Sequence, residues 1–397
     1  MPVPDETIQL ILNPARSHAP VLGQVAIRRS VEDFQVEELP LYQPSGSGDH
    51  AWLWIEKRGL TTQQVIAAIG DDLGIRAVDV GVAGQKDRWA VTRQFVSIPG
   101  RFATAAVAVQ RPGLQVLSVT HHKNKLRTGH LRGNRFSLRL CPPEGNRWTE
   151  SDRTAVADRL QLLQQAGFPN YYGIQRFGRG GATVQDGLRL LRGRLPKDYW
   201  PENQSRTMTR LVLNAVQSGV FNLVLSQRVQ DGTAGTPLPG DVVIRQGGIK
   251  PFLFPPANNP AGFIPAGPLP GPDMVRSTDA VLEIEAAALA RLGTTWKDFT
   301  RFRRITSGGR RKFLEFPEDT SVSLEPDGQL LLNFTLTSGT YATALLRELA
   351  ADVVDEGGNE EAGGTESAES PDTSETATSE APHSTSPDDP GSLETSG

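Results

Sequence analysis

The side chain best placed to do chemistry lies in a short segment between two predicted strands, residues 82–94. Here Asp87 occupies a tight turn between Lys86 and Arg88. Turns at strand ends expose their side chains, and two neighbouring cations favour the ionised form of the carboxylate. An ionised carboxylate can act as a nucleophile or as a base. The residues alone leave open a plainer alternative, in which Asp87 is an ordinary turn residue with solvated neighbours.

A second candidate segment, residues 121–136, interleaves cations with glycine, asparagine and one aromatic side chain. Cations can hold phosphates, Phe136 can stack on an unpaired base, and Asn134 can hydrogen-bond to the edge of that base. The pattern is typical of a nucleic-acid surface. Taken alone, however, the alternation of Phe136 with the leucines that follow favours a plain inward-facing strand position.

The predicted phosphate contacts are Lys123, Lys125, Arg127, Arg132 and Arg176. His121 and His122 adjoin two of these lysines, and neighbouring cations repel a metal ion. We therefore predict a solvated basic segment here and no metal site.

A third segment, residues 170–178, packs aromatics, cations and glycines into a short loop before a predicted helix. It contains neither the dinucleotide-binding nor the mononucleotide-binding glycine pattern. A structural or RNA-facing hinge is the better interpretation. Further cations between residues 301 and 312 either extend a phosphate-binding face or belong to an ordinary solvated surface.

The acidic residues are unevenly placed, so the formal net charge of −4 is misleading. Thirteen of the 45 acidic residues follow Ala350, where there is no Lys or Arg, and residues 1–350 therefore carry 41 basic and 32 acidic residues. This excess of positive charge suits a polyanionic partner. Residues 355–397 are rich in Ser, Thr, Glu, Pro and Gly, and we expect an acidic, disordered tail there.

The elements that must position Asp87 are predicted from hydrophobic periodicity. Strands are expected at 24–29, 34–38, 50–57, 78–83, 91–98, 114–120 and 131–140. Thr61 and Gln64 have the spacing of a capping box at the start of a helix. Helices are also expected at 149–166, 183–191, 211–229 and 279–292, a loop-rich insertion at 233–272, strands at 321–324 and 329–336, and a final helix at 338–353.

The chain has 397 residues, which is long enough for two domains or for one domain with a large insertion. Its single cysteine, Cys141, excludes a disulfide framework and a multi-cysteine zinc site. No uninterrupted apolar run reaches the roughly 20 residues that span a bilayer. The first twelve residues do not resemble a secretory signal. We expect a cytoplasmic protein without a membrane partner.

Four segments together resemble the successive signatures of the TruD family of tRNA pseudouridine synthases. They are Glu32-Asp-Phe34, Gly84-Gln-Lys-Asp87, Gly133-Asn-Arg-Phe136 and the string from Asn170 to Gly178. The resemblance runs from about Val25 to Leu349 in matching order and spacing. It departs from the family around residues 205–210, where the family more often has a Lys-Arg pair, and in the acidic tail.

The resemblance implies an α+β fold: a catalytic domain with a mixed, mainly antiparallel sheet flanked by helices, interrupted by an α/β insertion domain of the family. The corresponding assignment is residues 1–166 and 316–354 for the catalytic domain and 167–315 for the insertion. It also implies isomerisation of uridine 13 in the D arm of tRNA, without a cofactor. We expect a monomer. By position, Asp87 matches the catalytic aspartate. Phe34, Asn134, Phe136 and Lys86 match substrate-binding positions.

Two rivals remain at this point. One is a non-catalytic tRNA-binding or RNA-folding protein, against which the intact Asp87 argues. The other is a hydrolase of the glycosidase type, which needs two carboxylates flanking the scissile bond. The motifs show no second carboxylate of that kind.

Overall fold

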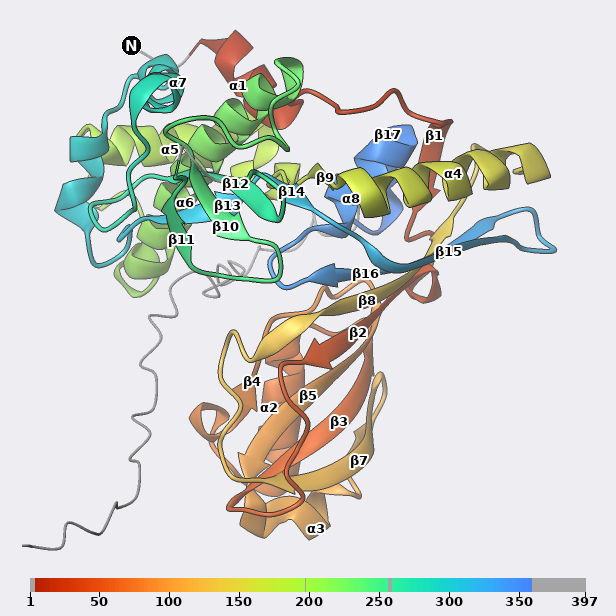
Figure 1. The fold of residues 1–397 in the computed structure, drawn as a ribbon. Helices are drawn as coiled ribbons and strands as arrows, with labels where there is room; N and C mark the ends of the chain where they lie inside the picture. Colours follow the sequence, from red (N-terminus) through yellow and green to blue (C-terminus); the bar gives the residue numbers. More distant parts are fainter. Residues whose placement is uncertain (1–3, 197, 256–258, 359–397) are drawn as a thin grey trace, which may run out of the picture.

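In the computed structural model, a large sheet forms the frame of the molecule, and residues 4–196, 198–255 and 259–358 are described. The sheet runs in the order β15-β16-β8-β2-β5-β3-β7-β6, and β4 pairs with β5. In this sheet β2 and β5 pair in parallel, and all the other neighbouring strands pair in antiparallel fashion. The predicted mixed, mainly antiparallel sheet of an α+β fold is therefore confirmed. Figure 1 shows this sheet descending from β15 and β16 to β7.

The strands of this sheet are β2 (Phe34–Pro40), β3 (His50–Arg58), β4 (Gly81–Val82), β5 (Val91–Pro99), β6 (Gln110–Arg111), β7 (Leu114–His122), β8 (Leu131–Leu140), β15 (Glu318–Leu324) and β16 (Leu330–Thr337). The strand predicted at 78–83 is shorter than expected, because residues Ala77–Asp79 form a 3-10 turn instead. The return of β16 beside β8 confirms that the C-terminal strands complete the first sheet.

Two apolar cores cover different halves of the sheet. Beneath β3 and β5, α2 (Thr62–Leu73) and α3 (Ala103–Ala106) pack on one core. The predicted capping box starts α2, since Gln64 N donates to Thr61 Oγ1 and Gln64 Oε1 accepts from Thr61 N. Beneath β2, β8 and β16, α4 (Glu150–Ala166) and α8 (Ala342–Leu349) pack on the other.

The predicted final helix is wrong beyond Leu349. Residues Ala350–Asp355 form β17, which pairs in parallel with β1 (Leu22–Ile27). From Ala350 onward the backbone N–H and C=O groups make hydrogen bonds with β1, so the helix does not continue. This partner lies more than 300 residues away, and local periodicity does not reveal it. A 3-10 turn at Glu356–Gly358 follows.

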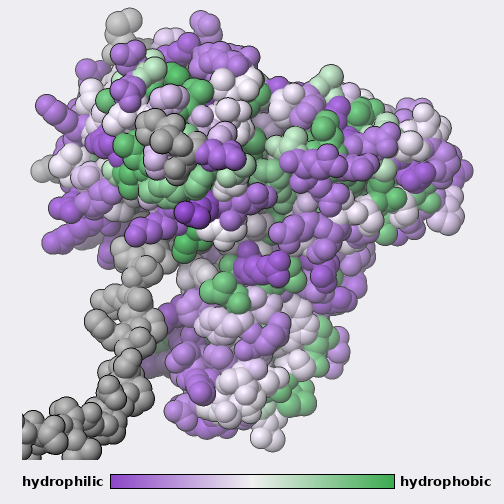
Figure 2. Space-filling model, viewed as in Figure 1, coloured by the Kyte–Doolittle hydropathy of each residue, from purple (hydrophilic) through white to green (hydrophobic). Residues whose placement is uncertain are grey.

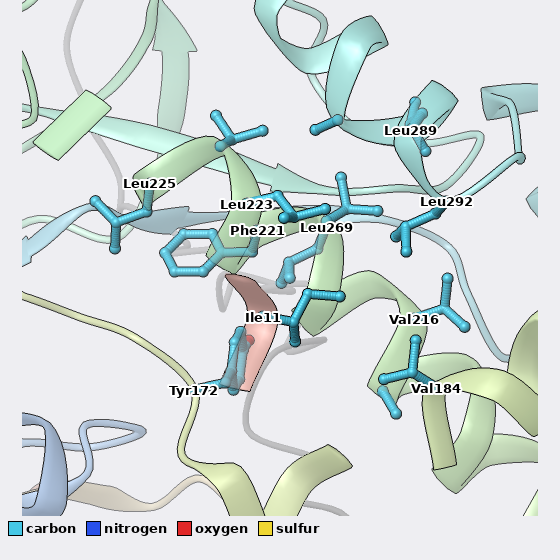
Figure 3. Packing of buried hydrophobic residues seen from close by; sticks show 14 of the residues in the cluster. Ile11, Tyr172, Val184, Val216, Phe221, Leu223, Leu225, Leu269, Leu289 and Leu292 are labelled. Atoms are coloured by element: carbon cyan, nitrogen blue, oxygen red, sulfur yellow. The ribbon is translucent and has the colours of Figure 1, made fainter. Parts of the chain in front are cut away.

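A third core belongs to residues 167–315 and surrounds α6 (Glu202–Gln230). Figure 3 shows Ile11, Tyr172, Leu269 and Leu292 lying around side chains of this helix such as Phe221. The same core includes Ile11 of α1 (Asp5–Leu12), so the structure places the N-terminal helix here, although our assignment grouped residues 1–166 with the catalytic domain. The apolar face of α1 packs against α6. The segment that follows α1 then leads back to β1.

The predicted loop-rich centre is wrong in one respect, because residues 233–272 contain β10 (Val242–Arg245), β11 (Pro251–Leu253) and β12 (Phe263–Leu269). With β13 (Gly309–Lys312) they form a four-stranded sheet. The remaining elements here are β9 (Phe168–Pro169), α5 (Ala182–Leu191), α7 (Asp279–Arg291) and β14 (Leu314–Glu315). β10 and β11 are short, and β11 and β12 contain proline, which masks their alternation.

One helix, α6, is long and apolar enough to cross a membrane, but 72% of its apolar window is buried inside the molecule. It is therefore the core helix of this part of the chain. Figure 2 shows hydrophilic residues over both parts of the molecule on the face drawn, with apolar residues in scattered patches.

Candidate active site

The turn that carries Asp87 lies between β4 and β5, as predicted. The Asp87 side chain is 53% exposed. Two backbone atoms of the turn make hydrogen bonds to side chains of neighbouring elements. Lys86 N donates to Thr62 Oγ1 at 2.9 Å, and Asp87 O accepts from Lys57 Nζ at 2.6 Å. The carboxylate therefore faces solvent from a backbone that is held by the start of α2 and the end of β3.

Arg28 is the ion-pair partner of Asp87, and the sequence analysis missed it. Its Nη2 lies 2.6 Å from Asp87 Oδ2, and its Nη1 lies 3.0 Å from Asp355 Oδ2. Arg28 has φ +59°, a conformation that is uncommon outside glycine. Its carbonyl accepts a hydrogen bond from Trp89 Nε1 at 3.0 Å, which holds the backbone in place. Strained backbone of this kind concentrates at functional sites.

The second carboxylate on Arg28 comes from the C-terminal strand. In the parallel pairing of β1 with β17, Ile27 is the register partner of Asp355. The turn after β17 also approaches closely, since a Cβ at Gly357 would lie 2.1 Å from Trp89 Cδ1. Strand pairing thus brings a second carboxylate, Asp355, to the guanidinium of Arg28, which the motifs alone did not reveal. Asp87 and Asp355 share this one cation, so Asp355 is not evidence for the pair of flanking carboxylates that a glycosidase needs.

An aromatic stack lies directly below this ion pair. The Cζ of Arg28 is 3.9 Å from the ring centroid of Phe34. Phe34 meets Phe136 edge-on at 6.2 Å, and Phe136 stacks on Phe334 at 5.1 Å. All three rings are buried in the core beneath β2 and β8. Phe136 thus occupies the inward strand position that its alternation favours, and it also lies one ring away from Arg28.

Lys86 and Asn134 are connected through Glu38. The ammonium of Lys86 turns inward and lies 2.9 Å from Glu38 Oε2, and both side chains are buried. Glu38 is the register partner of Asn134 across β2 and β8. Asn134 Oδ1 is buried and has no hydrogen-bond partner among the described residues. A buried acceptor without a donor costs free energy until a donor arrives, so this oxygen is a candidate contact for a bound base.

Lys57 is a further buried cation in this site that the sequence analysis missed. Its side chain is fully buried, and its Nζ donates to Asp87 O and to Leu60 O, each at 2.6 Å. Burial lowers the pKa of Lys57 to about 7, while the charge of Asp87 acts in the opposite direction. A sequence signal existed: in β3 the inward row Leu53, Ile55 ends on a lysine where an apolar residue is expected.

The predicted phosphate contacts are spread over several surfaces. Lys123 and Arg127 are exposed, and no ion pair to either is found within the described chain. Their loop adjoins the Asp87 turn, since Gly129 N donates to Ala83 O at 2.9 Å. Lys125 bonds to the carbonyl of Val78, and Arg132 pairs with Glu318 at 3.2 Å.

The predicted solvated histidine pair is wrong for His122. Its ring is buried and lies 4.4 Å from Trp52 and 5.4 Å from Tyr42, between centroids. Burial lowers its pKa. His122 lies on the inward side of β7, where the tryptophan of β3 covers it, and the local sequence does not reveal this neighbour.

The segment 170–178 makes contacts with several elements that are distant in the sequence. Arg311 Nε donates to Asn170 O at 3.1 Å, and Arg311 Nη2 donates to Gly339 O at 2.8 Å. Tyr172 N donates to Asn222 Oδ1 at 3.0 Å on α6. Arg176 lies over the ring of Tyr172 at 5.2 Å. The segment thus joins α6, β13 and the loop after β16, which supports the structural interpretation.

Comparison with known proteins identifies the family. The model of tRNA pseudouridine synthase D (TruD) matches residues 23–197 and 196–349. The tRNA pseudouridine synthase D of Anaeromyxobacter dehalogenans is 37% identical over 332 residues, which covers 82% of this chain and 92% of that protein. The chain belongs to the TruD family. It is a tRNA pseudouridine synthase, an isomerase whose substrate is tRNA.

Two further TruD relatives agree with this assignment. The protein of Thermus thermophilus is 36% identical over 330 residues, covering 81% of this chain and 88% of the relative. The crystal structure of the putative TruD from Methanosarcina mazei superposes with a TM-score of 0.67 at 23% identity, over 88% of this chain and 98% of that one. The latter supports the fold. The resemblance found in the sequence motifs is confirmed, and the family assignment favours an enzyme over a non-catalytic RNA-binding protein.

Proposed function

We propose that this TruD enzyme converts uridine 13 in the D arm of tRNA to pseudouridine, with Asp87 as the catalytic carboxylate. The observation that carries the proposal is the pairing of a half-exposed Asp87 with Arg28 directly above Phe34. An ionised carboxylate on a fixed turn, beside an aromatic stack, suits attack on a sugar next to a held base.

The reaction breaks the N1–C1′ bond, turns the uracil and joins C5 to C1′. The proton on C5 is lost and N1 gains one, so the change is an isomerisation without oxidation or reduction and requires no cofactor. Asp87 either attacks the ribose or removes a ribose proton to begin an elimination; a carboxylate suits both tasks. Arg28 holds the carboxylate in position in either route, because its Nη2 lies 2.6 Å from Asp87 Oδ2.

The other residues of the set hold the base. Uridine 13 leaves its stack at a cost of a few kcal/mol, which contacts in the site offset. Phe34 and Phe136 provide the apolar wall that keeps water from the detached uracil. The unpartnered Asn134 Oδ1 accepts a hydrogen bond from the uracil edge. Lys86 acts from the interior, by fixing Glu38 next to Asn134.

The test of this function is carbodiimide treatment and primer extension on unmodified tRNA incubated with the wild-type enzyme. The proposal expects one new stop at uridine 13. A stop at another uridine would support pseudouridine formation but contradict uridine 13 as the modified position. Release of free uracil instead of a retained base would favour a hydrolase. A monomeric, cytoplasmic enzyme remains part of the proposal.

We predict that Phe136→Leu lowers turnover by roughly 10-fold while the protein stays folded, because leucine fills the core position but removes the ring that lies between Phe34 and Phe334. Phe136→Ala is less informative, since it also costs about 3–5 kcal/mol of core packing. Single-turnover rates and thermal unfolding are measured together. An unchanged rate in Phe136→Leu would restrict Phe136 to a packing role.

We also predict that tRNA binding weakens steeply with salt, because the cations near the site release counterions from phosphates. The double variant Lys123→Ala/Arg127→Ala should bind less tightly and reduce the slope of log K against log salt by about 2 if both cations contact phosphates. Filter binding at several salt concentrations measures this. Arg132→Ala, whose cation is already paired with Glu318, serves as the comparison. An unchanged slope in the double variant would place tRNA on another surface.

A further inference from the structure

Lys57 differs from three other buried cations, Lys86, Arg228 and Arg310, in the groups that accept its hydrogen bonds. Lys86 pairs with Glu38 at 2.9 Å, Arg228 pairs with Asp241 at 2.8 Å, and Arg310 pairs with Glu285. Lys57 donates only to two main-chain carbonyls, of Leu60 and Asp87, within the residues that the structure describes. A buried ammonium without a carboxylate against it is costly, so a purely structural role would be filled more cheaply by an apolar side chain.

The charge of Lys57 is directed at the Asp87 turn. Its Nζ holds the peptide oxygen of Asp87, and the acidic group that acts on it electrostatically is Asp87 itself. On the outer side of the turn, Arg28 binds Oδ2 of the Asp87 side chain. Asp87 therefore lies between an outer guanidinium on its side chain and an inner ammonium on its backbone.

We propose that Lys57 is a positioning residue for the reaction: it holds the backbone of the Asp87 turn and places a positive charge on the inner side of that turn. This rests on the proposed role of Asp87. The Leu60 bond ties the same ammonium to the loop before α2, so one side chain couples the turn, β3 and that loop. A charge in the dry interior acts strongly on its neighbours.

The charged and polar groups near Lys57 lie on the Asp87 turn, on the loop before α2 and on the neighbouring strands β5 and β7. Asp87 and Lys86 belong to the turn, and Arg88 Nε reaches Gly59 O beside it at 3.4 Å. Thr92 on β5 and Leu114 on β7 are its register partners and carry no charge. Among these groups, Asp87 favours the protonated ammonium, and Lys86 opposes it.

The test compares wild type, Lys57→Met and Arg58→Met in single-turnover formation of pseudouridine on unmodified tRNA. Methionine has nearly the length of lysine without its charge or donors, and Arg58 is the exposed neighbour whose partners are Glu32 and Glu56. We expect Lys57→Met to lower the maximal rate roughly 10- to 100-fold with little change in tRNA affinity. Arg58→Met should retain the wild-type rate.

A pH profile separates this role from simple packing. Since the pKa of Lys57 is about 7, the wild-type rate should fall as pH rises through that value, and Lys57→Met should lack this alkaline limb. Equal rates, or the same limb in both proteins, would overturn the proposal. Should Lys57→Met fail to fold, Lys57→Arg provides a second test: its charge does not titrate in this range, so its rate should not fall through pH 7.

The two proposals fail in distinguishable ways. If wild type makes no pseudouridine, or if Asp87→Asn keeps the wild-type rate, the role of Asp87 is rejected. If wild type is active, Asp87→Asn is inactive and Lys57→Met matches wild type at all pH values, only the role of Lys57 is rejected.

Discussion

Replacing Asp87 by asparagine is expected to reduce the rate of pseudouridine formation on the order of 10⁴-fold or more, while tRNA binding stays within about threefold of wild type. Asparagine keeps the size of the side chain and an oxygen that can accept from Arg28, whose Nη2 lies 2.6 Å from the carboxylate. It removes the negative charge on which both nucleophilic attack and proton removal depend. Single-turnover assays and filter binding measure the two quantities.

Asp72→Asn is the matched control for this variant. Asp72 is also an aspartate paired with an arginine, Arg111 at 2.5 Å, but the pair lies on the surface at α2 and β6. Its asparagine variant should be as active as wild type. An active Asp87→Asn enzyme would contradict the catalytic assignment, and equal losses of binding and rate would instead indicate a role in holding tRNA.

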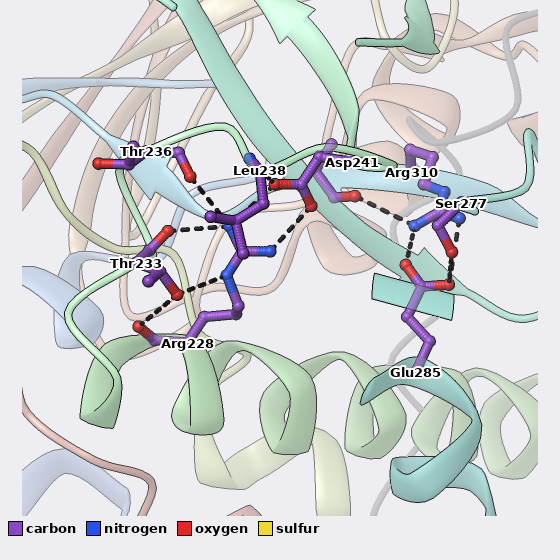
Figure 4. Close-up of polar contacts among 9 residues, drawn as sticks. Arg228, Thr233, Thr236, Leu238, Asp241, Ser277, Glu285 and Arg310 are labelled. Carbon is purple, nitrogen blue, oxygen red and sulfur yellow. Dashed lines mark hydrogen bonds and ion pairs between the residues drawn. The ribbon is translucent and has the colours of Figure 1, made fainter. Parts of the chain in front are cut away.

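The largest expected effect on stability comes from Asp241→Ala, which should lower the free energy of unfolding by about 3–5 kcal/mol. Arg228 and Asp241 are both buried, and Asp241 accepts from Arg228 Nη1 at 2.8 Å and from Arg228 Nη2 at 2.9 Å. Figure 4 shows the guanidinium enclosed by this carboxylate and by Thr233 and Thr236. Alanine leaves the cation buried with only its bonds to the threonines.

Urea unfolding of the full chain, followed by a probe of the α6 region, measures this loss. Asp273→Ala is the control, because Asp273 pairs with Arg303 on the surface, where the two side chains are 44% and 67% exposed. Exposed pairs contribute at most about 1 kcal/mol. A loss in Asp241→Ala no larger than in Asp273→Ala would mean that water reaches the guanidinium.

Local patterns predicted the elements whose cause is local. The start of α2 follows from Thr61 and Gln64, because a capping box needs only residues three apart. The turn at Asp87 follows from the two apolar runs beside it. Patterns failed where a distant segment competes, as in the last helix: from Ala350 onward the chain pairs with β1, and the strands of residues 233–272 pair with one another despite weak alternation.

By itself the sequence pointed to the side chains that we propose carry the chemistry: Asp87 on an exposed turn, and Phe34, Asn134 and Phe136 in motifs that resemble the family's. Only the tertiary structure decided which cations serve Asp87. Arg28 reaches it from the end of β1, and Lys57 reaches its backbone from β3. Ion pairs depend on separations of a few ångströms between residues far apart in the chain. Strand register and packing fix those separations, and no spacing within the sequence encodes them.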